Sequence, residues 1–201
     1  MFSVQKNTLY ETPVWVGKVG LTNEELKKLR DCALEAERKG VETRRSNRGL
    51  SFHTELNFLG PFSSDFPGAL KIAKAYQAAA LDYGFKLREA SFTYWSIVGN
   101  KYSYSARHEH GTAMLSGVLY VTTPEGSGNL RFCDPRPVKR MMNGEHYVSF
   151  RDKDDPRHND VEITPGEGLL VVFPSWLEHE VTMTMSEEPR IIYSFNMKPV
   201  S

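Results

Sequence analysis

The sequence predicts an α+β protein in which two N-terminal helices precede an antiparallel sandwich or jelly roll. Three observations predict this fold. Two segments before residue 90 have helical periodicity, short β-type runs separated by Gly, Pro, Asn and Asp fill the chain after residue 91, and no internal repeat is present. We therefore expect a single domain over residues 1–201, helical over about 1–90 and β-rich over about 91–201.

Local signals place the two helices. Thr22 is a suitable N-cap with Glu25 three residues later, the spacing of a capping box, and this first helix is expected to end near Gly40. The second helix is expected over about residues 67–83, followed by a glycine. Between the helices, residues 50–59 alternate imperfectly in hydrophobicity, which indicates a strand or an extended segment.

Seven short runs after residue 91 are rich in β-branched and aromatic residues, as strands are. Turn-forming residues separate them, so each run is expected to be a strand of the jelly roll. The runs are Phe92–Val98, Ser116–Thr122, Asn129–Phe132, His146–Phe150, Leu169–Phe173, Glu180–Met185 and Arg190–Asn196.

Composition excludes several classes of protein. The 25 Lys and Arg residues balance the 25 Asp and Glu residues, so no net charge attracts the chain to nucleic acid or to an anionic membrane. No apolar run approaches the roughly 20 residues that cross a bilayer, and the first ten residues lack a signal-peptide hydrophobic region. The two cysteines, Cys32 and Cys133, are expected to be reduced structural thiols. We expect a cytoplasmic protein that recognises its partners through a local site and not through its overall charge.

Histidines with metal-ligand spacing are the main chemical signal. His108 and His110 stand two residues apart, and in an extended chain such residues point to the same side about 6.6 Å apart, with Glu109 pointing away. His179 follows another apolar strand and a turn, so antiparallel pairing can bring it beside the first two. Each histidine taken alone is compatible with a structural role, and the combination of the three predicts a metal site.

A cation is expected near this site. Arg190 begins a strand on which Arg190, Ile192 and Ser194 share one face. Its guanidinium needs an anion, which is either a nearby protein carboxylate, Glu187 or Glu188, or the carboxylate of a bound ligand. The remaining histidines, His53, His146 and His158, have no motif around them and are expected to be structural.

These residues resemble the iron(II)- and 2-oxoglutarate-dependent oxygenases, whose motif is His-x-Asp/Glu, a distal His, and an Arg or Lys about ten residues further on. More narrowly, the chain resembles a family of small oxygenases of this kind found in marine bacteria and cyanophages. The likeness lies in five segments, SNRGLSFH (46–53), RHEHGTAMLSGVLYV (107–121), GNLRFCDPRP (128–137), GEGLLVVFPSWLEHEV (166–181) and RIIYSFN (190–196).

The resemblance implies a double-stranded β-helix, the cupin-like form of the jelly roll, with the helices packed outside. It implies Fe(II) bound by His108, His110 and His179, and 2-oxoglutarate as cosubstrate with its far carboxylate on Arg190, assisted by Tyr120 and Ser194. It further implies O₂ and a small-molecule substrate, hydroxylation of an unidentified C–H bond, a homodimer at the level of a family expectation, and the host cytoplasm if the gene belongs to a phage. Tyr120 on its own is equally compatible with a core aromatic residue.

One position departs from the broader superfamily. His110 stands where the motif has Asp or Glu, which gives three imidazoles and no anionic ligand unless Glu109 or another carboxylate contributes. Three-His iron sites also occur in cupin dioxygenases that need no 2-oxoglutarate, so such an enzyme is the second hypothesis. A jelly-roll binding module without catalysis, whose histidines are only structural, is the third.

Overall fold

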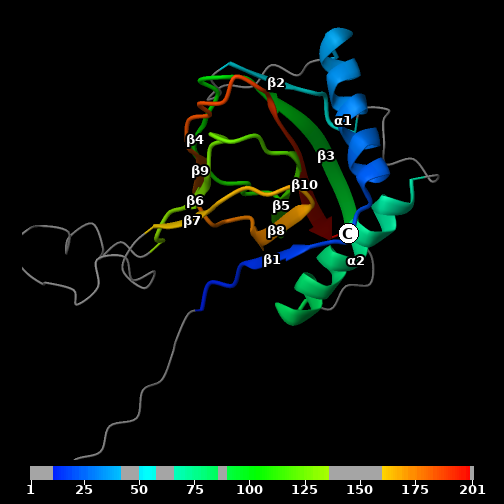
Figure 1. Ribbon diagram of the computed structural model, residues 1–201. Coiled ribbons are helices and arrows are strands. Elements are labelled where there is room, and N and C mark those ends of the chain that lie inside the picture. The colour runs from blue at the N-terminus through cyan, green and yellow to red at the C-terminus, as the bar shows by residue number, and fades with distance from the viewer. Residues whose placement is uncertain (1–10, 42–49, 58–65, 86–89, 136–159, 200–201) are drawn as a thin grey trace, which may run out of the picture.

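The structure is a computed structural model that describes residues 11–41, 50–57, 66–85, 90–135 and 160–199. Its strands form two antiparallel sheets, one of six strands in the order β1-β8-β5-β10-β3-β2 and one of four strands in the order β4-β9-β6-β7. The sheets face one another with both helices on the outer side of the larger sheet (Figure 1). This arrangement is the predicted jelly roll with external helices.

The elements run along the chain as follows: β1 (Trp15–Lys18), α1 (Asn23–Arg38), β2 (Ser51–His53), α2 (Pro67–Asp82), β3 (Ala90–Gly99), β4 (Ser105–His108), β5 (Leu115–Thr122), β6 (Leu130–Phe132), β7 (Val161–Ile163), β8 (Leu169–Pro174), β9 (His179–Val181) and β10 (Arg190–Pro199).

Both helices begin as their sequences indicate. In α1 the Thr22 hydroxyl accepts a hydrogen bond from the Glu25 backbone N–H at 3.2 Å, and the Glu25 carboxylate accepts one from the Thr22 N–H at 2.7 Å. This is the expected capping box, which satisfies two backbone donors that the helix leaves open. In α2 the fixed φ of Pro67 suits the first helical turn, and the helix ends at Asp82.

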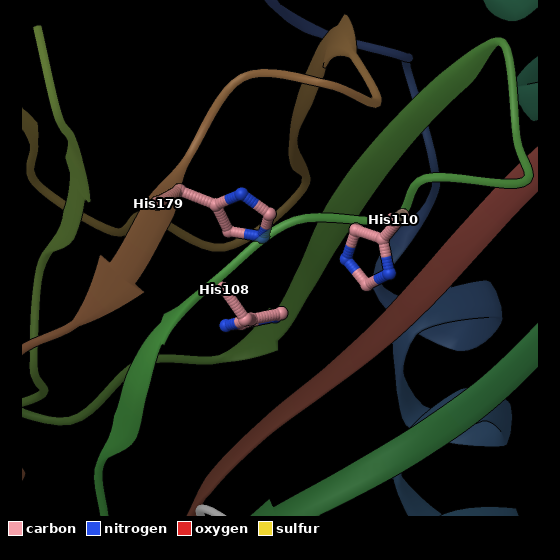
Figure 2. Close-up of side chains that lie close together, drawn as sticks. All are labelled: His108, His110 and His179. Atoms are coloured by element: carbon pink, nitrogen blue, oxygen red, sulfur yellow. The ribbon is translucent and has the colours of Figure 1, made fainter. Parts of the chain in front are cut away.

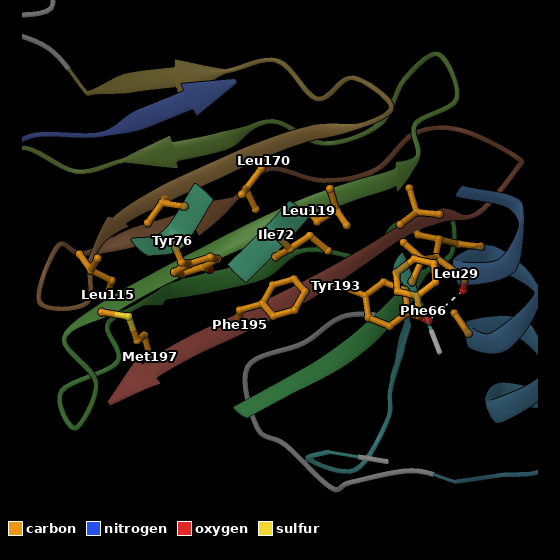
Figure 3. Packing of buried hydrophobic residues seen from close by; sticks show 14 of the residues in the cluster. Leu29, Phe66, Ile72, Tyr76, Leu115, Leu119, Leu170, Tyr193, Phe195 and Met197 are labelled. Atoms are coloured by element: carbon orange, nitrogen blue, oxygen red, sulfur yellow. Dashed lines mark hydrogen bonds between the residues drawn. The ribbon is translucent and has the colours of Figure 1, made fainter. Parts of the chain in front are cut away.

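The helices bury their apolar faces against the outer face of the larger sheet, and Figure 3 shows side chains of this layer. Leu29 of α1 and Tyr76 of α2 are fully buried there. The hydroxyl of Tyr193 on β10 donates a hydrogen bond of 2.8 Å to the Leu29 carbonyl, which links the central strand to α1. A second apolar layer fills the space between the two sheets and contains Trp95, Val118, Leu130 and Phe173, among others.

Helix α2 lies very close to β5, and Gly117 permits the approach. A Cβ at this position would overlap the Tyr76 hydroxyl and would lie 2.5 Å from the Val171 carbonyl oxygen. We expect Gly117→Ala to lower the free energy of unfolding by about 1 to 3 kcal/mol, as overpacking of a core does. Chemical denaturation measures this change. Gly17→Ala on β1 is the control, because its Cβ would meet no atom within 4 Å, and equal destabilisation by both variants would contradict the packing explanation.

The predicted strands agree with the structure over most of the β body, with two differences. The run Glu180–Met185 is a strand only as β9, His179–Val181, and the chain after it forms the turn that leads to β10. The strands β4 and β7 are additional, and the run His146–Phe150 lies outside the described residues. In the N-terminal part, the predicted strand or extended segment 50–59 contains β2, whereas β1 is an additional strand, and the two form the edges of the larger sheet. Among the described residues, no helix is both long and apolar enough to span a membrane.

Candidate metal centre and adjoining cavity

Three histidines meet between the two sheets. His108 ends β4, His179 begins β9, and the two are direct partners in the antiparallel register. His110 follows on the loop that leads to β5, and all three rings point into one space (Figure 2). One ligand nitrogen from each ring lies within 4.8 Å of the other two. The spacing of His108 and His110 and the strand pairing of His179 thus produce the predicted cluster, which suits a transition-metal ion such as Fe(II).

Backbone carbonyls fix the orientation of two of these rings. His108 Nδ1 lies 2.7 Å from the Ala106 carbonyl oxygen, and His179 Nδ1 lies 2.8 Å from the Leu177 carbonyl oxygen. A carbonyl oxygen only accepts hydrogen bonds, so Nδ1 is the protonated nitrogen of each ring. The Nε2 lone pair is then available, and a backbone acceptor on the other ring nitrogen is the usual support of a metal-ligating histidine.

The His110 backbone is held by a buried polar network. Its N–H donates a 2.9 Å hydrogen bond to the Ser175 carbonyl. The Ser175 hydroxyl lies 2.7 Å from the Ser116 hydroxyl, which donates a 2.8 Å hydrogen bond to the Asn196 side-chain oxygen. Ser116 and Ser175 are both buried. This network ties the loop that carries His110 to β5, to β10 and to the residue that follows β8, so the fold of the larger sheet fixes the position of the His110 backbone.

The cluster contains no carboxylate among the described residues. Glu109 is exposed and is not part of it, which contradicts the alternative in which Glu109 supplies an anionic ligand. Burial, together with the neighbouring His108 and His110 rings, lowers the pKa of His179 to about 3. The imidazole of His179 is therefore neutral at pH 7, which is the form that binds a metal ion.

The lowered pKa of His179 has a consequence for acid stability. An unfolded chain takes up a proton on this histidine near its ordinary pKa of 6.5, whereas the folded chain takes it up only near pH 3. The contribution of His179 to the free energy of unfolding is therefore fully present above pH 6.5 and is lost progressively as the pH decreases toward 3.

We expect the free energy of unfolding of metal-free protein to fall by at most about 1.4 kcal/mol per pH unit on account of this one group. Urea unfolding at a series of pH values measures the slope. His179→Asn should reduce it, and an unchanged slope would show that residue 179 is not held neutral in the folded protein.

A cavity of about 230 Å³ adjoins the three histidines. Its lining is largely apolar, with polar groups at a few positions, as is usual for sites that bind small molecules. The lining residues are His53, Trp95, Ile97, Ser105, His108, His110, Gly117, Val118, Tyr120, Leu130, Phe173, His179, Val181, Arg190, Ile192 and Ser194.

Arg190 is the only arginine or lysine in the described lining of this cavity, and it is 2% exposed. Its Nη1 donates a 3.1 Å hydrogen bond to the Gly128 carbonyl, while its Nε has no hydrogen-bond partner among the described residues. No described carboxylate forms an ion pair with it, and Glu187 instead pairs with Lys101. The alternative that Glu187 or Glu188 neutralises Arg190 is thus wrong. A buried cation without a protein anion is costly, and burial lowers the pKa of Arg190.

Tyr120 and Ser194 lie where the sequence pattern puts them, on the same cavity. Tyr120 is directly opposite Ile192 of β10, and its side chain is 1% exposed. Burial raises the pKa of Tyr120 to about 12, while the positive charge of Arg190 opposes this rise. The phenol is therefore a neutral hydrogen-bond donor beside the guanidinium. Tyr120 also belongs to the apolar layer between the sheets, so it is both a core residue and a lining residue.

Comparison with known proteins identifies the family. Residues 93–196 match a family described as "Putative 2OG-Fe(II) oxygenase", and this segment covers more than half of the chain and contains all six predicted site residues. The chain belongs to this family. The cluster of three imidazoles and the buried guanidinium, which no described carboxylate neutralises, fit its two cofactors, Fe(II) and 2-oxoglutarate. A comparison with curated proteins gave no match.

Three solved structures illustrate the similarity of this chain to proteins of the same fold. A prolyl-4-hydroxylase from Pseudomonas putida is 17% identical with a TM-score of 0.65, covering 94% of this chain and 93% of that one. HygX from Streptomyces hygroscopicus, with nickel and 2-oxoglutarate bound, is 11% identical with a TM-score of 0.60, covering 94% and 84%. The α-ketoglutarate-dependent carbocyclase SnoK from nogalamycin biosynthesis is 14% identical with a TM-score of 0.61, covering 93% and 79%. At these identities the likeness concerns the fold.

Other predictions from the sequence have mixed outcomes. Trp95 also lines the cavity, and its ring centroid lies 6.0 Å from that of His110. Cys32 and Cys133 are both free thiols. His53 has no motif and is expected from the sequence to be structural, yet it lines the cavity. His146 and His158 lie outside the described residues.

Proposed function

We propose that this protein is an Fe(II)- and 2-oxoglutarate-dependent dioxygenase that hydroxylates a small molecule or a side chain, using O₂. His108, His110 and His179 hold the metal, and Arg190, Tyr120 and Ser194 bind 2-oxoglutarate, Arg190 and Tyr120 at its far carboxylate. The observation that carries the proposal is one cavity with a cluster of three imidazoles at one end and, at the other, a buried guanidinium that no described carboxylate neutralises.

The positions along β10 support a ligand that bridges these two ends. Ser194 is opposite Trp95, whose ring contacts that of His110, so Ser194 marks the metal end of the cavity. Arg190 lies four residues earlier on the same strand, about 13 Å away along the strand, and its own side chain spans part of this distance. A ligand with a chelating group at one end and a carboxylate at the other, as in 2-oxoglutarate, matches this arrangement.

When bound together, Fe(II) and 2-oxoglutarate supply the oxidising chemistry that is typical of this family. The described residues would hold both groups and exclude water from them. The three imidazoles would occupy one side of the metal position, the Arg190 guanidinium and the Tyr120 hydroxyl would hold the far carboxylate, and the apolar side chains Ile192 and Val118 would exclude water. Because no described carboxylate belongs to the histidine cluster, these residues would leave the full positive charge of a bound Fe(II) uncompensated, which would favour an anionic chelating ligand.

Turnover without a hydroxylation substrate provides the test. Protein supplied with Fe(II), O₂ and 2-oxoglutarate is expected to convert the 2-oxoglutarate to succinate, and the conversion should require all three. Measuring succinate by mass spectrometry, and 2-oxoglutarate binding to the Mn(II)-loaded protein by calorimetry, covers both steps. If the metal binds but 2-oxoglutarate neither binds nor reacts, the three-His dioxygenase that uses no 2-oxoglutarate replaces the proposal. If no transition metal binds, the site is not catalytic.

A further inference from the structure

His53 lies outside the family segment 93–196 but lines the same cavity. It is buried on β2, the edge strand that lies beside β3 (Figure 1). Thr54 secures this strand, because its N–H donates a 3.1 Å hydrogen bond to the Ser96 carbonyl and its hydroxyl accepts one of 2.9 Å from the Ser96 N–H. The backbone that carries His53 is therefore held firmly against the larger sheet.

The register of the sheet places His53 at the end of a row of residues on the cavity side. His53 is opposite Ile97, Ile97 is opposite Ile192, and Ile192 is opposite Tyr120. Directly opposed residues in antiparallel strands point to the same face, and all four line the cavity. The two isoleucines form an apolar floor, with the polar side chain of Tyr120 at one end and that of His53 at the other.

The adjacent row contains Arg190. Ser51 of β2 is opposite Gly99 of β3, and Gly99 is opposite Arg190. A Cβ on Gly99 would lie 3.5 Å from Arg190 Nη2, so the guanidinium extends over the strand that separates Arg190 from β2. A carboxylate held by Arg190 above the isoleucine floor therefore has Tyr120 on one side and the β2 residues on the other.

Ser51 and His53 form a hydrogen-bonded pair on this side. The Ser51 hydroxyl oxygen lies 3.1 Å from His53 Nε2. When the Ser51 hydroxyl donates this hydrogen bond to Nε2, the polar hydrogen of the imidazole is on Nδ1. In this tautomer His53 is itself a hydrogen-bond donor through its Nδ1–H.

We propose that His53, oriented by Ser51, is a specificity-determining residue that donates a hydrogen bond to the far carboxylate of the 2-oxo acid. With Arg190 and Tyr120 it surrounds that carboxylate on three sides, so the cavity selects a dicarboxylate 2-oxo acid over a monocarboxylate one. This inference rests on the proposed function, because it assigns a residue to the cosubstrate of that same site.

Comparing the binding of two ligands distinguishes a hydrogen bond from His53 to the far carboxylate from a purely structural role of His53. 2-Oxoglutarate has the far carboxylate, whereas 2-oxobutyrate has the same chelating end without it. Binding of each to the Mn(II)-loaded protein is measured by calorimetry. His53→Ala is expected to weaken 2-oxoglutarate binding about tenfold, which is the usual effect of losing a hydrogen bond to a charged group, and to leave 2-oxobutyrate binding unchanged. Ser51→Ala should have the same selective effect at about threefold, because it removes only the group that orients the ring.

Further variants keep the test decisive if His53→Ala folds poorly. His53→Gln retains an N–H donor and is expected to recover part of the preference for 2-oxoglutarate. Phe52→Leu is the matched control, since Phe52 is on the same strand but packs toward the helices, and it should not change the ratio of the two affinities.

Equal weakening of both ligands by His53→Ala or by Ser51→Ala, or no weakening of either, would overturn the inference while leaving the proposed function intact. Failure of the unmodified protein to bind 2-oxoglutarate more tightly than 2-oxobutyrate would instead overturn the role of Arg190 in the proposed function, and this inference with it.

Discussion

Replacing Arg190 by alanine is expected to weaken the binding of 2-oxoglutarate at least tenfold, or about 1.4 kcal/mol or more. The reason is the absence of any described carboxylate paired with this buried guanidinium. A ligand carboxylate would provide a full counter-charge, and the planar guanidinium can form two parallel hydrogen bonds with it. Calorimetric titration of the Mn(II)-loaded protein with 2-oxoglutarate measures the effect.

The same substitution should not destabilise the ligand-free protein. Arg190 forms no ion pair among the described residues and donates one described hydrogen bond, to the Gly128 carbonyl. Its removal therefore relieves the cost of a buried, unneutralised charge at the expense of the contacts of the side chain. We expect the midpoint of thermal unfolding without ligand to be maintained or raised. The stabilisation that 2-oxoglutarate confers should be lost in the variant, since a ligand stabilises only the state that it binds.

Two further arginine variants control for charge and for geometry. Arg131→Ala removes an arginine that pairs with Glu162 and Glu180 away from the cavity, so 2-oxoglutarate binding should not change. Arg190→Lys keeps the positive charge without the planar pair of donors, and its affinity should lie between those of the unmodified protein and Arg190→Ala. An unchanged affinity in Arg190→Ala would mean that the far carboxylate binds at another place in the cavity.

The parts of the site that the sequence predicts are those in which local spacing determines geometry. His108 and His110 share a side because alternate residues of an extended chain do so, and Arg190 faces the cavity with Ser194 for the same reason. The position of His179 also follows from the pattern of strands, since antiparallel pairing with β4 is the simplest way to bring it beside the other two. These predictions need only the two-residue alternation of side chains in a strand and the order of the predicted strands along the chain.

The place of His53 on the cavity is not predictable in the same way. Its strand has only three residues, and its position depends on pairing with β3, more than 40 residues later in the chain. The hydrogen bonds between Thr54 and Ser96 that secure this pairing leave no signal in a periodic pattern. The strand β1 is missed for a related reason: it is a four-residue edge strand with three exposed residues, so its burial does not alternate clearly.

The absence of a described carboxylate beside Arg190 is likewise a property of the folded chain alone. Glu187 and Glu188 are close to Arg190 in sequence, which makes a local ion pair a reasonable expectation. In the structure the turn before β10 leaves both glutamates exposed, while the arginine is buried between the sheets. The choice between a protein anion and a ligand anion is therefore decided by burial, which sequence distance does not reveal.

His179→Ala is expected to abolish binding of Fe(II) and Mn(II) while leaving the fold largely intact. The ring of His179 lies close to both other rings of the cluster, with its centroid 4.4 Å from that of His108 and 5.2 Å from that of His110. Its removal leaves two imidazoles and no carboxylate among the described members of the cluster. Two neutral ligands hold a divalent ion weakly, because stable sites of this kind use at least three protein ligands.

Metal content by mass spectrometry after dialysis measures this loss, and thermal unfolding with and without Mn(II) provides a second readout. The unmodified protein should be stabilised by the metal, and the variant should not. His53→Gln is the matched control, since His53 lines the cavity but does not belong to the cluster, and it should retain its metal. Stoichiometric metal in a folded His179→Ala protein would mean that the ion is held elsewhere, and the proposed roles of His108 and His110 as metal ligands would then fail as well.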